Sequence, residues 1–240
     1  EMCIRDRATA TAAPDFGYAL VTRKTTAAQR ARWDLSNLTM AMSAGEPVRP
    51  ATRAAFAAAF ADSGFSPEAF CPAYGLAEHT VGATLWGGRA GSFSTEGMQA
   101  RRLIDATGDE ATAMLSSGQP APGVEVAIAS LPGDAGPARR LSDRQIGEVW
   151  LRSPSVARGY RGLPDLTAER FAATLQGEDG TWLRTGDLGA LWDGELVITG
   201  RLKDLILIGG RNVYPEDIEE TVRQRGLAIR PGGIAAVGLL

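Results

Sequence analysis

The sequence has few of the residues on which metal centres and disulfide frameworks depend. Its 240 residues include one histidine, His79, and two cysteines, Cys3 and Cys71, which are far apart and form no C-x-x-C pair. These numbers exclude a metal site built from several histidines and a small fold held together by disulfides. They also favour a reducing compartment, so we expect a cytoplasmic protein.

Long apolar runs and a basic excess are also missing. The longest aliphatic runs, such as residues 205–208, are far shorter than the roughly 20 apolar residues of a membrane span. The first residues do not form the basic and then apolar pattern of a secretory signal. The formal net charge is -3, whereas a surface that follows nucleic-acid phosphates needs a basic excess. We therefore expect neither a membrane span nor a nucleic-acid partner.

The composition is that of a folded protein with a sizeable core. Hydrophobic residues make up 44% of the chain and charged residues 22%, which excludes a disordered chain. The length corresponds to one large domain, or to one domain and part of a second. We interpret residues 1–7, which have no periodicity, as a cloning or sequencing artefact. Residues 234–240 resemble a buried strand, and we expect the natural protein to continue beyond them.

Hydrophobic periodicity and turn residues predict a mixture of helices and strands. Helices are expected at 25–33 (N-capped by Thr25 or Thr26), 50–61, 166–173 and 215–224. Strands are expected at 70–74, 124–129, 148–152, 182–185, 190–192, 196–198 and 205–208, with a hairpin turn at Asp193-Gly194. Residues 14–22 predict no clear element, and residues 84–117 predict a loop with one short helix. The mixture favours an α/β fold.

The segment Tyr74-Gly75-Leu76-Ala77-Glu78 combines residue types that suit a nucleotide. A glycine after an apolar strand lets the backbone approach a flat ligand, and a tyrosine can cover a ring face. The Glu78 carboxylate is a hard oxygen ligand of the kind that holds Mg²⁺ beside phosphates. The alternative interpretation is an ordinary turn from a strand into a helix.

Two later segments carry groups that suit a sugar phosphate. Asp187, in Thr185-Gly186-Asp187, can accept hydrogen bonds from both hydroxyls of a ribose, and Gly186 leaves room for the sugar. Arg201, in the segment 200–204, can hold ribose or phosphate oxygens with its fork of donors. The alternatives are a common Gly-Asp turn and an exposed, salt-bridged turn that also contains Lys203.

The order and spacing of these segments resemble those of the adenylate-forming superfamily of acyl-CoA synthetases, peptide-synthetase adenylation domains and luciferases. Residues 74–78 resemble its adenine and magnesium motif, 147–160 its barrel motif, 185–187 its ribose motif and 200–204 its hinge motif. The resemblance covers almost everything from residue 14 to residue 240.

Within the superfamily the chain is most similar to the fatty acyl-AMP ligases, which serve polyketide and lipopeptide assembly lines. Pro14-Asp15-Phe16-Gly17-Tyr18 resembles the Pro-Asn-Phe-Ala-Tyr of that branch, and residues 212–219 resemble its Asn-x-Tyr-Pro-Gln-Asp-Ile-Glu. Residues 95–114 correspond to the place of an insertion that CoA ligases lack. In the family, this insertion restrains the small domain and disfavours the arrangement that uses CoA.

The resemblance implies a fold and a division into domains. Residues 1–199 would be the C-terminal portion of the large AMP-binding domain, a layered α/β structure plus a small antiparallel β-barrel. Residues 200–240 would contain the hinge and the start of a small α+β lid domain. The phosphate-binding loop of the family would lie upstream of residue 1, and the catalytic lysine beyond residue 240.

The resemblance also implies roles for individual residues. Glu78 would bind Mg²⁺, Asp187 the ribose hydroxyls, and Arg201 the ribose and phosphate; Glu78 and Arg201 would be the catalytic residues. Lys203 would be the hinge about which the lid rotates. The residues that would frame the adenine are Gly45, Glu46, Pro47, Tyr74, Gly75 and Leu76.

The implied activity is ATP- and Mg²⁺-dependent conversion of a fatty acid into an acyl-adenylate. The acyl group would then pass to an acyl carrier protein or a polyketide synthase module. Two alternatives are left open at this point: a fatty acyl-CoA synthetase, and a non-catalytic nucleotide-binding or interaction module.

Overall fold

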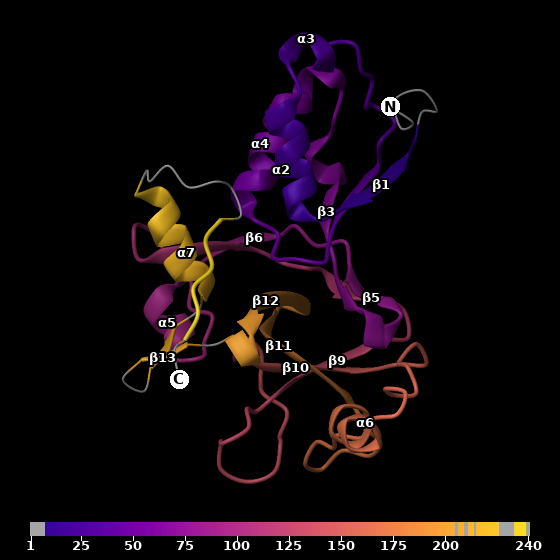
Figure 1. Cartoon of the computed structure of the whole chain (residues 1–240), viewed down its shortest axis with the longest axis vertical. Helices are drawn as coiled ribbons and strands as arrows, with labels where there is room; N and C mark the ends of the chain where they lie inside the picture. The colour runs from indigo at the N-terminus through magenta and orange to yellow at the C-terminus, as the bar shows by residue number, and fades with distance from the viewer. Residues whose placement is uncertain (1–7, 205, 209–210, 214, 226–232, 239–240) are drawn as a thin grey trace.

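A parallel three-stranded sheet forms the N-terminal part of the computed structural model, which describes residues 8–204, 206–208, 211–213, 215–225 and 233–238 (Figure 1). Its strands are β1 (Ala10–Ala13), β2 (Met40–Ser43) and β3 (Phe70–Pro72), in the order β1-β2-β3. Helices α2 (Asp15–Lys24) and α3 (Ala27–Arg30) connect β1 to β2, and α4 (Pro50–Phe60) connects β2 to β3. These are the crossover connections that parallel strands require.

Aromatic side chains hold these helices against the sheet. Tyr18 of α2 lies edge-on to Phe56 of α4, with 5.1 Å between ring centroids, and its hydroxyl donates to the Met42 carbonyl of β2 at 2.8 Å. Asp15, at the start of α2, is buried and accepts hydrogen bonds from the Thr52 hydroxyl and the Arg49 backbone N–H. Burial raises the pKa of the Asp15 carboxyl. The position of α2 is therefore set by one packed ring and one buried polar group.

The second large element is an antiparallel sheet in the order β12-β11-β10-β9. Its strands are β9 (Glu125–Ala129), β10 (Gly147–Arg152), β11 (Leu183–Trp192) and β12 (Glu195–Arg201). Asp193 and Gly194 connect β11 to β12 with φ values of 51° and 85°, the backbone required by a tight hairpin turn. Strands β9 and β12 do not pair with each other in the described part of the chain, so this sheet is open and not a closed barrel.

Smaller elements fill the space around and between the two sheets. Strands β4 (Tyr74–Leu76), β5 (Val81–Leu85) and β8 (Gln119–Pro120) form one antiparallel sheet, and β6 (Ala90–Ser94) pairs with β7 (Ala111–Leu115). The remaining helices are α5 (Thr95–Gln99), α6 (Pro164–Phe171) and α7 (Pro215–Gln224). The 3₁₀ turns are η1 (Ala61–Ser63), η2 (Pro67–Ala69), η3 (Ala77–His79) and η4 (Leu202–Asp204), and β13 (Ile206–Ile208) pairs with β14 (Arg211–Val213).

The α/β class and most elements predicted from the sequence are confirmed. The helix predicted at 50–61 is α4, the helix at 215–224 is α7, and Thr26 caps α3 by a capping box. The hairpin at Asp193-Gly194 is present, and the strands predicted at 182–185 and 190–192 are parts of one strand, β11. The strand predicted at 205–208 is β13 over residues 206–208; residue 205 lies outside the described residues, as do residues 1–7.

Four predictions are wrong. The stretch 14–22, where no clear element was expected, lies in α2 from residue 15 onward. Residues 84–117 contain strands β6 and β7 besides the short helix α5. The small barrel is an open sheet, because β9 and β12 stay apart. Residues 234–238, the described part of the strand expected at 234–240, are in no strand.

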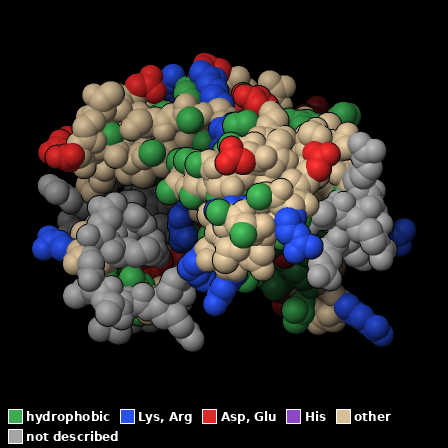
Figure 2. All heavy atoms as spheres, turned by 90° about the horizontal axis from the view of Figure 1, so that it is seen from above, with side chains coloured by type: hydrophobic (Ala, Val, Ile, Leu, Met, Phe, Trp, Pro, Cys, Tyr) green, Lys and Arg blue, Asp and Glu red, His purple; other side chains and the backbone are tan. Residues whose placement is uncertain are grey.

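The helices of the described residues and one face of the surface bear on the expected absence of a membrane span. In the part of the chain that the structure describes, every helix is too short or too polar to cross a bilayer. Figure 2 shows acidic and basic side chains on the same face, with hydrophobic side chains between them. This mixture of charges agrees with the small net charge of -3.

The aromatic core yields a prediction about stability. Phe60 is 1% exposed, whereas Phe16 is 61% exposed. We expect Phe60→Ala to lower the free energy of unfolding of the 240-residue chain by about 3–5 kcal/mol, because it leaves a cavity. Phe16→Ala is the matched control and should cost less than about 1 kcal/mol. Urea titration measures both, and equal losses would contradict this description of the core.

Candidate functional site

Two segments leave the parallel sheet at the same edge. Strands β2 and β3 run in the same direction, with Ser43 opposite Pro72, and the Ala73 N–H donates to the Ser43 carbonyl at 2.9 Å. Residues 45–47 follow β2, and Tyr74 follows β3. Ligands of open α/β sheets bind outside the carboxyl ends of the strands. The two segments with predicted adenine contacts therefore begin at the edge where a ligand is expected.

Tyr74, Asp187 and Arg201 form one hydrogen-bonded group. The Tyr74 hydroxyl donates to Asp187 Oδ2 at 2.7 Å, and Arg201 Nε donates to Asp187 Oδ1 at 2.9 Å. Asp187 of β11 pairs with Arg201 of β12, so the sheet itself brings the two side chains together. Asp187 is 7% exposed. Each carboxylate oxygen keeps a second lone pair, with which Asp187 can still accept a hydrogen bond.

The environment keeps the Tyr74 hydroxyl protonated. Burial raises the pKa of Tyr74 well above its usual range, and the negative charge of Asp187 raises it further. The phenol is therefore a permanent donor to the carboxylate, and Asp187 is held as an acceptor. We conclude that this group presents acceptor oxygens to any hydroxyl that approaches it.

Gly75 is required by a close approach of two backbones. A Cβ built on Gly75 would lie 1.4 Å from the Val81 carbonyl oxygen, which no side chain could accommodate. The β4–β5 pairing shifts its register between Tyr74 and Gly75, and Val81 has a φ of 92°, which is rare for a β-branched residue. The absence of a side chain at Gly75 therefore permits the tight turn that follows Tyr74.

Glu78 lies in the 3₁₀ turn η3 and is held by the loop that follows β10. Its Oε1 accepts a hydrogen bond from the Tyr160 hydroxyl at 2.7 Å, and its carbonyl accepts one from the Ala157 N–H at 2.8 Å. Burial and this hydrogen bond raise the pKa of Tyr160. Glu78 is four residues after Tyr74, so their Cα atoms are at most about 14 Å apart. The chain thus keeps Glu78 in the neighbourhood of the Tyr74–Asp187 pair.

Two further hydrogen bonds attach the same loop to the residues after Glu78. One joins His79 Nε2 and the Ser153 hydroxyl at 2.7 Å, and in the other the Thr80 hydroxyl donates to the Ser155 carbonyl at 2.8 Å. His79 is 1% exposed, and burial lowers its pKa. These contacts give His79 a structural role, because its buried ring fastens the loop after β10 to η3.

The chemistry of Glu78 suits a magnesium ion shared with phosphates. The described residues contain no group of three or more His, Cys, Asp or Glu side chains placed to hold a metal. Tyr160 occupies one lone pair of Glu78 Oε1, and the carboxylate retains others for a cation. Mg²⁺ is commonly bound by one or two carboxylates together with substrate phosphates and water. A single carboxylate is therefore sufficient only if a phosphate supplies further ligands.

The other predicted site residues make no hydrogen bond to this group in the described part of the chain. Glu46 accepts a hydrogen bond from the Phe16 N–H, in the first turn of α2, where a carboxylate is favoured. Gly45, with a φ of 88°, and Pro47 are exposed beside it. No hydrogen bond joins residues 45–47 to Tyr74 or Asp187 among the residues described. Leu76 is half-buried at the end of β4, and Lys203 is exposed in η4, two residues after Arg201.

Sequence reasoning gave no role to two residues that the structure brings to the site. Tyr160 contacts Glu78 from 82 positions away, and Glu148 contacts the backbone of Gly186 from 38 positions away. Both belong to the segment 147–160, which was noted only for its resemblance to a barrel motif. The glycine at position 159 was a usable signal in the sequence, because glycine permits an unusual backbone directly before Tyr160. In the structure its φ is 136°.

A comparison with protein families identifies the family of the chain. The family model for AMP-binding enzymes matches residues 3–161, and the chain belongs to this family. A similar curated protein is the medium-chain-fatty-acid–acyl-carrier-protein ligase JamA of Moorena producens, with 39% identity over 98% of this chain and 40% of that protein. The chain thus spans about 40% of the length of JamA.

Other relatives have related names. The long-chain-fatty-acid–AMP ligase FadD32 of Mycolicibacterium smegmatis is 36% identical over 85% of this chain and 34% of its own length. The putative fatty-acid–CoA ligase FadD21 of Mycobacterium tuberculosis is 37% identical over 95% of this chain and 39% of its own length. Among solved structures, a fatty acyl-adenylate ligase from L. pneumophila in complex with acyl adenylate and pyrophosphate has a TM-score of 0.78 and 36% identity, over 94% of this chain and 40% of that chain.

The backbone contact at Gly75 gives a prediction with a built-in control. We expect Gly75→Ala to cost about 1–3 kcal/mol of stability or more, because the new methyl group would overlap the Val81 carbonyl. Gly82→Ala should be tolerated, because the nearest atom, in Leu85, would lie at an ordinary 3.7 Å. Chemical denaturation of the two variants tests this, and a Gly75→Ala protein as stable as Gly82→Ala would refute it.

His79 gives a prediction about pH. Because burial lowers its pKa, the neutral ring is favoured in the folded state, and stability should be lost as the pH falls below about 6.5. As the pH falls, we expect the free energy of unfolding to decrease more steeply in the wild type than in His79→Gln. The difference between the two slopes should be at most about 1.4 kcal/mol per pH unit. Gln preserves a polar atom for Ser153, so the comparison isolates the charge. Parallel curves between pH 5 and 7 would contradict it.

Proposed function

We propose that this chain is part of a fatty acyl-AMP ligase, an enzyme that activates a fatty acid with ATP and delivers the acyl group to an acyl carrier protein. The observation that carries the proposal is the hydrogen-bonded group of Tyr74, Asp187 and Arg201. It combines a ring, two acceptor oxygens and a guanidinium in one place. These are the groups needed for the base, the sugar and the phosphate of a nucleotide.

In this proposal each residue binds a different part of the nucleotide. Asp187 accepts hydrogen bonds from the ribose hydroxyls with the lone pairs that Tyr74 and Arg201 leave free. Arg201, whose side chain is 57% exposed, directs its remaining donors to ribose and phosphate oxygens. The segments Gly45-Glu46-Pro47 and Tyr74-Gly75-Leu76 frame the adenine from the edge of the parallel sheet.

The reaction requires positioning and neutralisation of charge. A carboxylate oxygen of the fatty acid attacks the α-phosphorus of ATP, the bond to the bridging oxygen breaks, and pyrophosphate leaves with that electron pair. Glu78, oriented by Tyr160, is the protein ligand for Mg²⁺, which when bound neutralises phosphate charge. Arg201 stabilises negative charge that develops on the transferred phosphate, so Glu78 and Arg201 are the proposed catalytic residues.

The proposed domain division places residues 1–199 in the AMP-binding domain and residues 200–240 in the hinge and the start of a lid. Strand β12 continues to Arg201, so the last paired residue of the sheet lies at this boundary. Lys203 follows in the exposed turn η4 and is the proposed hinge. A hinge needs a residue free to change its backbone angles, and an exposed turn between two sheets meets that need.

The segment 95–114 supports delivery to a carrier protein. In it, Met98 and Leu103 are buried in one core cluster with Leu188 and Trp192, so the segment is anchored to the antiparallel sheet. Its helix α5 also contacts β14, in the proposed lid. A segment fixed to the large sheet that touches the lid is placed to restrain it. We infer that this is the insertion that disfavours the use of CoA.

A fatty acyl-CoA synthetase is the second candidate, because the relative FadD21 is named a putative fatty-acid–CoA ligase. Product analysis separates the two: the proposal expects acyl transfer to the phosphopantetheine thiol of a carrier protein, free-standing or within a polyketide synthase module, and little thioester with free CoA. Binding of AMP without pyrophosphate release would instead indicate a non-catalytic module. We further propose a cytoplasmic location, since ATP and carrier proteins are available there.

The activity is tested on the chain completed at both ends. We expect pyrophosphate release with ATP, Mg²⁺ and a medium-chain fatty acid, and a loss of about 100-fold or more in Glu78→Gln and Asp187→Asn, because a charged ligand or acceptor is removed. Asp193→Asn is the matched control. Asp193 is also an aspartate paired with an arginine, Arg89 at 2.7 Å, but it lies on the hairpin turn between β11 and β12 and outside the proposed site.

The control should keep its rate within about twofold of the wild type. Full activity in both Glu78→Gln and Asp187→Asn would show that the site assignment is wrong. No pyrophosphate release from the wild type with any fatty acid would show that the proposed reaction is wrong.

A further inference from the structure

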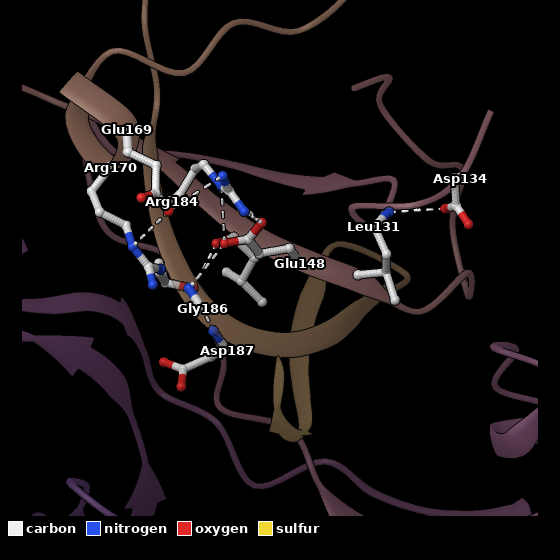
Figure 3. Close-up of polar contacts among 10 residues, drawn as sticks. Leu131, Asp134, Glu148, Glu169, Arg170, Arg184, Gly186 and Asp187 are labelled. Carbon is white, nitrogen blue, oxygen red and sulfur yellow. Dashed lines mark hydrogen bonds and ion pairs between the residues drawn. The ribbon is translucent and has the colours of Figure 1, made fainter. Parts of the chain in front are cut away.

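Glu148 is a buried carboxylate that the mechanism above does not use. It lies on β10, is 0% exposed, and has two partners on β11 (Figure 3). Its Oε1 accepts a hydrogen bond from the Gly186 N–H at 3.1 Å, and its Oε2 accepts from Arg184 at 3.1 Å (Nε) and 3.0 Å (Nη2). A fully buried carboxylate is rare unless it is paired in this way.

The strand that Glu148 contacts is irregular at this point. Glu148 is opposite Leu188 and Trp150 is opposite Arg184, so residues 185–187 of β11 face only Val149 of β10. These residues are the Thr185-Gly186-Asp187 segment, and they leave the regular ladder of hydrogen bonds. Gly186 has a φ of 77°, in the left-handed region that favours glycine.

Side chains replace the ladder bonds that the bulge lacks. The Thr185 hydroxyl donates to the Val149 carbonyl at 2.6 Å, and Glu148 accepts the Gly186 N–H. Figure 3 shows the Asp187 carboxylate turned away from the Glu148–Arg184 pair, on the other side of the bulge. The shape of the bulge thus determines the direction in which Asp187 points.

We propose that Glu148 is a positioning residue for the nucleotide: together with Arg184 it fixes the bulge so that Asp187 faces the ribose. This inference rests on the proposed function, because it needs Asp187 to bind ribose hydroxyls. Loss of the carboxylate charge weakens the pairing with Arg184, whose side chain is 19% exposed, and loosens the hold on the Gly186 N–H. The Asp187 oxygens would then be displaced from the hydroxyls.

The test separates positioning from general stability by using two ligands. Binding of AMP and of 2′,3′-dideoxy-AMP, which lacks both ribose hydroxyls, is measured by calorimetry on the chain completed at both ends. The wild type should prefer AMP. We expect Glu148→Gln to weaken AMP binding by about 10-fold and dideoxy-AMP binding by less than about twofold, because only AMP uses the Asp187 oxygens.

Glu125→Gln is the matched control. Glu125 lies on β9 of the same sheet and is paired with Arg152 through two hydrogen bonds of 2.9 and 2.6 Å, but it is not joined to the bulge. It should leave the binding of both nucleotides within about twofold of the wild type. A ratio of the AMP and dideoxy-AMP affinities that changes in Glu148→Gln but not in Glu125→Gln would support the positioning role of Glu148.

Three results would overturn the inference. They are equal weakening of both nucleotides in Glu148→Gln, no weakening of either, and the same change of ratio in Glu125→Gln. If Glu148→Gln does not fold, Arg184→Lys serves instead, because it keeps the charge but loses the two-point grip on Glu148. An unchanged ratio in that variant would also overturn the inference. A wild type that does not prefer AMP would refute the ribose role of Asp187, which belongs to the proposed function, and the inference with it.

Discussion

The hydrogen bonds to the Asp187 carboxylate are the interaction on which the site depends. They join Tyr74, which follows the parallel sheet, to Arg201, at the end of the antiparallel sheet. Asp187 is almost completely buried, and a carboxylate in such a place must be paired. Its two partners come from different sheets, since Tyr74 lies on β4 of the β4-β5-β8 sheet and Arg201 on β12 of the larger antiparallel sheet, so the pairing of Asp187 links these two sheets.

Two special backbone segments frame this interaction. One is the turn after Tyr74, where Gly75 lets the Val81 carbonyl come too close for any side chain. The other is the bulge at residues 185–187, where Gly186 adopts a left-handed conformation. Strand pairing is irregular at both segments. At the bulge, Glu148 accepts a hydrogen bond from the Gly186 N–H, and after the turn, Tyr160 donates one to the Glu78 carboxylate. Local irregularity of this kind is concentrated at binding sites because it directs side chains toward a ligand.

Local patterns in the sequence were sufficient for most elements and failed where distant contacts decide. Helix α4 follows from Pro50 and two phenylalanines four residues apart, and the β11–β12 hairpin from Asp193-Gly194. Helix α2 was missed because its stability comes from the buried Asp15 and Tyr18, and its own pattern is weak. The β6–β7 pair was missed because the two strands are separated by the excursion from Thr95 to Glu110.

The sequence by itself determined the residue types of the site and their family resemblance: a tyrosine and a glycine before Glu78, an Asp after Thr-Gly, and an arginine after the hairpin. The family match over residues 3–161 agrees with that resemblance. Only the tertiary structure decided that Tyr74 and Asp187, 113 positions apart, share a hydrogen bond, and that Tyr160 and Glu148 support the site. The reason is physical: periodicity and turn residues report neighbours along the chain, whereas the pairing of buried polar groups depends on which strands fold against each other.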